Sequence, residues 1–205
     1  VLRLDRPLPI WMYKDEIQLL RERMFASETW FEWGSGGSTV ALATHLPNLQ
    51  KIVSVDSSWS WLDNLRRRND LANALATGRL VLLFANIGVT GSFGHPKDPR
   101  GNFDNYFRAI QAVEGPWDTI LIDGRFRVAC FLAALTQADE NTRLLVHDYS
   151  ARLGLYEYGM TKYAELVATR GMLSVFRASK AVLEQSPAVL RSLHADLSFF
   201  GHVSD

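Results

Sequence analysis

The decisive stretch of this chain reads Trp33-Gly34-Ser35-Gly36-Gly37-Ser38-Thr39. It lies between the apolar segment Thr29–Trp33 and the helix-like run Val40–Leu46, so it predicts a strand, a glycine-rich turn and a helix. Glycine tolerates positive φ and lets a ligand approach the backbone closely. The first N–H groups of a helix have no intrahelical partner and attract anionic groups. The stretch therefore predicts a cradle for a small molecule.

The bulk composition favours one domain over residues 1–205, of which 47% are hydrophobic. Lys plus Arg and Asp plus Glu number 22 each, and this balance disfavours a nucleic acid or an anionic membrane as partner. The single cysteine, Cys130, fits a reducing compartment, and no apolar run reaches the length of a membrane span. We therefore expect a cytoplasmic protein that acts on a small-molecule substrate. The oligomeric state does not follow from the sequence, and a homodimer stays open.

Short apolar segments alternate with helical ones along the chain. Strands are predicted at Trp30–Trp33, Ile52–Asp56, Leu80–Phe84, Thr119–Asp123, Leu144–His147 and Met172–Phe176. Helices are predicted at Lys14–Phe25 (within an N-terminal helical extension over residues 1–28), Ser38–Leu46, Trp61–Ala76, Phe126–Ala138, Thr161–Thr169 and Pro187–Asp196. This alternation predicts an α/β fold with a Rossmann-like, doubly wound and mostly parallel sheet between two helical layers, a three-layer α/β/α sandwich. Ligands of such sheets bind at the carboxyl ends of the strands.

Polar residues follow the predicted strands at that edge. Glu32 stands just before the glycine turn, where a carboxylate can hold a cationic or hydroxyl group of a ligand. Asp56 lies about 20 residues after Gly36, where it can accept hydrogen bonds from both hydroxyls of a ribose, although it could instead cap the following helix. The dinucleotide fingerprint requires a third glycine where this chain has Thr39. A nicotinamide-dependent oxidoreductase is therefore the less favoured alternative.

Taken in order, Glu32–Thr39, Asp56, Asn86 and Asp123-Gly124 resemble the motifs of class I S-adenosylmethionine-dependent methyltransferases, over roughly residues 32–149. The phrases EWGSGGST, GSFGHP, DGRFRVAC and HDYSAR resemble more narrowly a small bacterial methyltransferase-like group. The resemblance implies S-adenosyl-L-methionine as cofactor. The implied cofactor-binding residues are Glu32, Gly34, Ser35, Gly36, Gly37, Ser38, Asp56, Ser57, Asn86, Ile87, Asp123 and Gly124.

Within that set, the resemblance implies a role for each position. Glu32 and the glycine backbone would hold the methionine part of the cofactor, and Asp56 the ribose. Asn86 and Ile87 would face the adenine. Ser57 departs from the family, which often has a larger apolar side chain against the base. The tail after Phe176 looks helical, so we expect the closing antiparallel hairpin of the family to be modified or lost.

The later strand ends suit methyl transfer to an oxygen or nitrogen of a small molecule. Alignment of the reactants contributes most to such a displacement, and a general base can assist it. The catalytic candidates are Asp123, Asp148 and His95. Strand alternation places His147 on the face opposite Asp148, which favours a core role for the histidine. The aperiodic segment 86–107 is interpreted as a substrate lid that contains His95, with a plain surface insertion as the alternative.

Arginines after the fourth and fifth strands could bind an anionic acceptor. We assign substrate binding to Arg125, Tyr149 and Arg152, and leave Arg127 as either a further contact or a solvated helix position. Asp123 and Asp148 also stand where catechol-type methyltransferases place magnesium ligands, but Tyr149 replaces an amide of that pattern, and we assign no metal. A methyltransferase-like protein that binds the cofactor without catalysis is the main alternative function.

Overall fold

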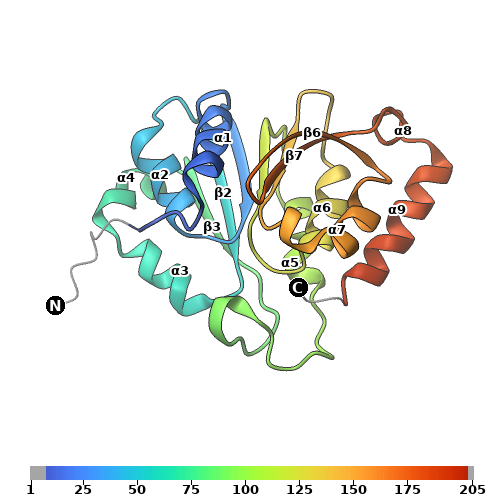
Figure 1. Cartoon of the computed structure of the whole chain (residues 1–205). Helices are drawn as coiled ribbons and strands as arrows, with labels where there is room; N and C mark the ends of the chain where they lie inside the picture. Colours follow the sequence, from blue (N-terminus) through green and yellow to red (C-terminus); the bar gives the residue numbers. More distant parts are fainter. Residues whose placement is uncertain (1–7, 203–205) are drawn as a thin grey trace.

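The computed structural model describes residues 8–202, which fold around a seven-stranded sheet (Figure 1). The strands are β1 (Thr29–Trp33), β2 (Lys51–Asp56), β3 (Leu80–Phe84), β4 (Thr119–Ile122), β5 (Arg143–Val146), β6 (Ala164–Arg170) and β7 (Leu173–Ala178). They lie in the order β3-β2-β1-β4-β5-β7-β6. Strands β1 to β5 are parallel, whereas β7 runs antiparallel to both β5 and β6.

Helices cover both faces of this sheet. They are α1 (Lys14–Phe25), α2 (Gly37–His45), α3 (Trp59–Arg66), α4 (Ala72–Ala76), α5 (Asp104–Phe107), α6 (Arg127–Leu135), α7 (Leu153–Met160), α8 (Lys180–Leu183) and α9 (Pro187–Phe200). Helices α1 to α4 pack on the face that carries Trp30 and Leu121, and α5 to α9 pack on the face that carries Phe31 and Ile120. The predicted three-layer, mostly parallel α/β fold is confirmed.

The central elements form because their side chains can be buried on all sides. Strand β4 is buried at every position, as parallel strands between two helical layers must be. All nine residues of α6 are buried, and Cys130 packs among them as a core thiol. Helix α6 begins at Arg127, shortly after β4 ends at Ile122. Because both elements are buried, the short connection between them is held in place.

The predicted helix Thr161–Thr169 is wrong, because this segment forms the edge strand β6. Strand β6 joins β7 through Gly171 and Met172 and forms an antiparallel hairpin, so the expectation of a modified or lost closing hairpin is also wrong. Gly171 has a φ of 58°, which a tight two-residue hairpin turn requires. Since β6 is mostly exposed, it lacks the apolar alternation by which strands are recognised.

Other elements differ in extent. The predicted helix Trp61–Ala76 is broken between α3 and α4, where Arg68 is buried and pairs with Asp70 at 2.5 Å. Helices α5, α7 and α8 have no counterpart in the sequence prediction. Of the predicted extension over residues 1–28, positions 1–7 lie outside the described residues. Within residues 8–202, every helix is too short or too polar to cross a lipid bilayer.

Candidate functional site

A cavity of about 610 Å³ lies at the carboxyl ends of β1, β2 and β4. Its lining residues are Leu8–Trp11, Gly34–Ser38, Asp56–Ser58, Trp61, Gly91, Phe93, Gly94, Tyr106, Asp123–Arg125, Arg127, His147 and Asp148. The volume is in the range of sites that enclose a drug-sized ligand. The cavity occupies the edge at which doubly wound sheets bind ligands.

The glycines of the turn after β1 meet different requirements. Gly34 has a φ of 97°, and a Cβ there would come within 2.8 Å of the Asp123 carbonyl oxygen. A Cβ at Gly37 would collide with the Pro9 carbonyl. Gly36 faces open space, with no atom within 4 Å of an added Cβ. Two glycines therefore allow protein segments to pack closely, and Gly36 borders the cavity itself.

Glu32 lies beneath the turn and outside the lining of the cavity. Its fully buried carboxylate accepts hydrogen bonds from Ser54 Oγ at 2.8 Å and from the Thr39 hydroxyl, and burial raises the pKa of the group. Thr39 Oγ1 in turn accepts the Gly36 N–H at 2.8 Å. Glu32 thus supports the turn from below, whereas the sequence suggested that it meets the ligand directly.

Asp56 ends β2 and faces the cavity beside the turn. Its Oδ1 accepts the Ser58 N–H at 2.8 Å. Burial raises the pKa of Asp56 to about 6, although backbone N–H groups of Ser58, Ser35 and Ser57 partly offset this effect. Helix α3 is capped by the Ser58 side chain, which accepts the Trp61 N–H, so Asp56 is not needed for that role.

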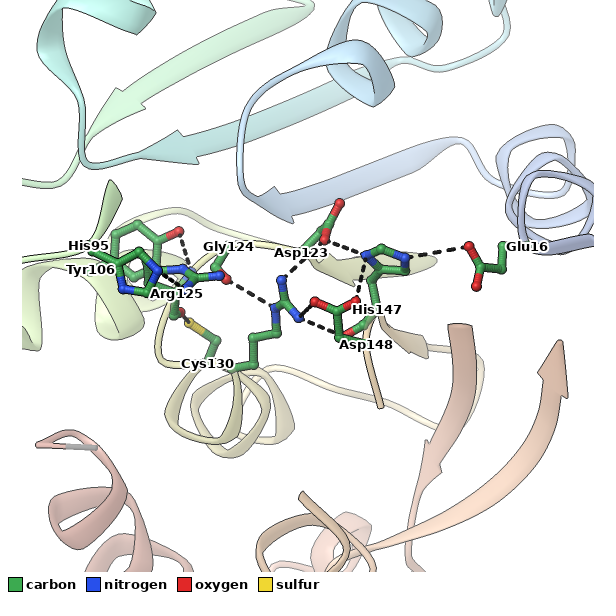
Figure 2. A network of polar contacts seen from close by, with 10 residues as sticks. Glu16, His95, Tyr106, Asp123, Gly124, Arg125, Cys130, His147 and Asp148 are labelled. Atoms are coloured by element: carbon green, nitrogen blue, oxygen red, sulfur yellow. Dashed lines mark hydrogen bonds and ion pairs between the residues drawn. The ribbon is translucent and has the colours of Figure 1, made fainter. Parts of the chain in front are cut away.

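The floor of the cavity is a network of charged side chains (Figure 2). Arg127 donates to Asp148 Oδ2 at 2.5 Å and lies 3.5 Å from Asp123 Oδ1. It also donates to the carbonyl oxygens of Gly124 and His147, each at 3.0 Å. The alternative of a solvated Arg127 is wrong, because the residue is only 3% exposed. Its guanidinium lies between the two carboxylates that the magnesium alternative would use.

His147 and Asp148 both line the cavity, so the expectation that one of them points away is wrong. Asp148 has a φ of 60°, which breaks strand alternation directly after β5. Burial disfavours the charged form of Asp148, but the hydrogen bond and charge of Arg127, with the charges of His147 and Arg152, together outweigh it and lower the pKa of this carboxyl. Burial likewise opposes a charged His147, but the hydrogen bond to Asp123 and the charges of Asp123 and Asp148 together outweigh it and raise the pKa of the imidazole.

Several predicted contacts do not reach the cavity. Asn86 is exposed and its Oδ1 accepts the Gly88 N–H at 3.0 Å, while Ile87 is buried in the core. The Tyr149 ring packs against Phe176 with 5.0 Å between centroids, and Arg152 is exposed. These four residues follow the right strands but turn toward the core or solvent, which strand spacing does not reveal.

The predicted lid over residues 86–107 divides into two parts. Phe103, Tyr106 and Phe107 are buried in the core, so the upper boundary of this segment is wrong. The exposed part brings Gly91, Phe93 and Gly94 to the cavity wall, with Phe93 in a positive-φ conformation of 55°. His95 is exposed and lies outside the lining. Its Nε2 lies 2.8 Å from Nη1 of Arg125, which does line the cavity.

Sequence reasoning missed two parts of the wall. The segment Leu8–Trp11 crosses the glycine turn and lines the cavity, but it lies outside the motifs and has no periodicity. Trp61 donates its indole N–H to the Ser35 carbonyl at 2.7 Å and so joins α3 to the turn. The apolar residues around Ile10 were the one available signal, and they are equally typical of a core contact.

No family model and no curated protein matches this chain. Solved structures do. A methyltransferase-like protein from Silicibacter pomeroyi is 29% identical, with a TM-score of 0.73 over 93% of this chain and 97% of the other. The O-methyltransferase from Bacillus cereus, in complex with SAH, is 15% identical, with a TM-score of 0.52 over 82% of each chain.

The O-methyltransferase TomG from Streptomyces achromogenes, involved in tomaymycin synthesis and solved with SAM, is 13% identical. Its TM-score is 0.53, over 84% of this chain and 82% of that one. The two O-methyltransferases support the likeness in fold, and the Silicibacter protein extends it to the sequence over nearly the whole chain. The chain thus has the fold of the class I S-adenosylmethionine-dependent methyltransferases.

Proposed function

We propose that this protein transfers a methyl group from S-adenosylmethionine to an oxygen or nitrogen of a small molecule. One observation carries the proposal. The glycine turn after β1 and the Asp56 carboxylate at the end of β2 face the same cavity, whose volume of about 610 Å³ suits a nucleoside-sized ligand. This arrangement puts a backbone cradle beside a carboxylate that can accept both hydroxyls of a ribose.

The residues present fit the cofactor at this end. The open side of Gly36 leaves room for a ligand against the backbone, and Asp56 is the carboxylate available to a sugar. Two structural neighbours, from Bacillus cereus and Streptomyces achromogenes, were solved with SAH and with SAM. When bound, S-adenosylmethionine supplies an activated methyl group. The chain itself has to orient the acceptor and exclude water, and orientation contributes up to about 7–11 kcal/mol in favourable cases.

A second candidate is a protein that binds the cofactor without transferring its methyl group. The observation in its favour is the pairing of the floor acids, because Arg127 binds Asp148 and His147 binds Asp123. Arg127 donates to Asp148 Oδ2 at 2.5 Å, so this oxygen is already occupied and is not available to take a proton from an acceptor.

Both candidate functions require binding of the cofactor, and calorimetric titration with S-adenosylmethionine and S-adenosylhomocysteine tests this. Asp56→Ala should weaken either ligand roughly 100-fold, since it removes two hydrogen bonds to a charged group. Asp63→Ala is the matched control, because Asp63 pairs with exposed Arg67 and lies outside the cavity. Unchanged affinity in Asp56→Ala, or binding of a nicotinamide dinucleotide in place of the cofactor, contradicts the proposal.

Transfer of tritium from methyl-labelled S-adenosylmethionine to a panel of phenols, catechols, carboxylic acids and primary amines then separates the two candidates. We expect a labelled product whose formation requires the intact Asp56. Binding without label transfer to any acceptor class would favour the non-catalytic module.

A further inference from the structure

Glu16 lies behind the cavity floor and joins it to the N-terminal helix α1 (Figure 2). The residue is fully buried. Its Oε2 accepts the Tyr13 N–H and its Oε1 accepts the Met172 N–H, both at 2.6 Å. Gly171 makes room for it, because a Cβ there would approach Oε1 to 2.5 Å. Burial of a carboxylate is unfavourable unless hydrogen bonds or an opposite charge compensate for the lost hydration. A positively charged neighbour would therefore stabilise Glu16.

That neighbour is His147, which stands between two carboxylates. Its Nδ1 lies 2.8 Å from Asp123 Oδ1, and its Nε2 lies 3.5 Å from Glu16 Oε2. The other charged groups that face it are Asp148, 3.8 Å from Nδ1, and Arg127, which donates to the His147 carbonyl. Ionised carboxylates only accept hydrogen bonds. Nε2 forms no hydrogen bond within residues 8–202, so Glu16 acts on it through its charge, at 3.5 Å. A proton on both ring nitrogens is therefore the arrangement that suits a ring between two carboxylates.

Asp123 presents its two oxygens differently. His147 and Arg127 both contact Oδ1. Within residues 8–202, Oδ2 has no hydrogen-bond partner, and the side chain is 31% exposed where it lines the cavity. One oxygen is therefore anchored and the other is available to a ligand. Asp148 lacks this arrangement, because Arg127 holds its Oδ2 at 2.5 Å.

We propose that Asp123 takes the proton of the methyl acceptor, and that His147, held from behind by Glu16, is the positioning residue that fixes Asp123 for this step. The inference rests on the proposed function. The O–H or N–H bond of the acceptor breaks and its proton passes to Asp123 Oδ2. The acceptor electron pair forms the new bond to the methyl carbon, while the methyl–sulfur electron pair stays on the departing sulfur. No further oxidant, reductant or metal is required to balance the reaction.

The first test is independent of ligand and of activity. In ¹⁵N-labelled protein at neutral pH, both ring nitrogens of His147 should carry protons in the NMR spectrum, and His147→Gln identifies the signals. In Glu16→Gln the Nε2 proton should exchange faster and the Nδ1 signal should shift. Exposed His45 is the internal control and should stay unchanged. A His147 ring with an unprotonated nitrogen at neutral pH overturns the inference.

The second test uses tritium transfer to whichever acceptor of the panel the wild type labels. His147→Gln and Glu16→Gln should lower kcat about 100-fold, within the range that general-base assistance contributes, and leave the acceptor KM within a few-fold. Affinity for S-adenosylhomocysteine should stay within threefold, because neither residue touches the glycine turn or Asp56. His45→Gln should transfer at the wild-type rate.

These outcomes separate the two proposals. If the wild type fails to bind S-adenosylhomocysteine, the proposed function is wrong, whatever the histidine spectrum shows. If it binds the product and transfers methyl groups, but His147→Gln keeps its kcat, the positioning role is wrong and the proposed function stands. Should Glu16→Gln fail to fold, His147→Gln and Asp123→Asn decide the question, and wild-type kcat in Asp123→Asn excludes Asp123 as the proton acceptor.

Discussion

The two ends of the cavity are built by different physics. At the glycine turn, backbone geometry and neutral hydroxyls shape the wall: Gly34 lies against the Asp123 carbonyl, and Thr39 and Ser54 donate to one buried acid. At the floor, Arg127 and His147 are buried with the acids Asp123 and Asp148. The first end is encoded by neighbouring residues, and the second brings together the ends of β4 and β5 and the start of α6. Substitutions at the turn should therefore destabilise the protein through steric strain. Substitutions at the floor should destabilise it by leaving a charge without its partner.

The largest effect should come from the floor. Arg127→Met removes a buried cation, which leaves Asp148 without its main partner and Asp123 without one of its two partners, and should lower the free energy of unfolding by about 3–5 kcal/mol. Denaturant unfolding measures this change. Arg67→Met is the matched control, because its 2.6 Å pair with Asp63 is largely exposed and should contribute about 0–1 kcal/mol. If both variants lower the free energy of unfolding equally, the charge pairs of the floor contribute no more than a pair on the surface.

A second, somewhat smaller effect should come from the turn. Gly34→Ala forces an alanine to adopt a left-handed backbone conformation and brings its Cβ to 2.8 Å from the Asp123 carbonyl oxygen. We expect a loss of about 2–3 kcal/mol in the free energy of unfolding, from strained backbone. Gly36→Ala, which meets no atom within 4 Å, should cost about 1 kcal/mol or less yet weaken cofactor binding. If Gly36→Ala is less stable than Gly34→Ala, the turn does not pack closely against the end of β4.

The smallest effect sharpens the role of Asp56. Its pKa of about 6 means that the ligand-free carboxyl is ionised at pH 7 and mostly protonated at pH 5. Only the ionised form accepts both ribose hydroxyls, so affinity for S-adenosylhomocysteine should fall about 10-fold from pH 7 to pH 5. Calorimetry across this range checks the slope. Asp56→Asn should bind weakly at both values and show no such step, and a wild-type affinity that stays flat argues against Asp56 as the ribose ligand.

Much of the fold follows from local sequence. Strand β3 is predicted to the residue at Leu80–Phe84, because its five consecutive residues are all apolar, although it lies at the edge of the sheet. The exposed edge strand β6 is predicted as a helix, because its own residues show no apolar alternation. It forms a strand because it pairs with β7, which its local sequence does not record. Short helices such as α5 are stabilised by packing of Tyr106 and Phe107, which a local pattern cannot weigh.

The sequence by itself determined the strand–turn–helix with its glycines, the carboxylate at Asp56 and the edge of the sheet where both lie. These are local features, since a glycine turn and a strand end are written in consecutive residues. Only the tertiary structure decided that Glu32 supports the turn from below, that Arg127 joins the two floor acids, and that Glu16 reaches His147 from a helix 131 positions earlier in a chain of 205 residues. Burial and charge pairing depend on which distant segments meet, and spacing along the chain carries no record of that.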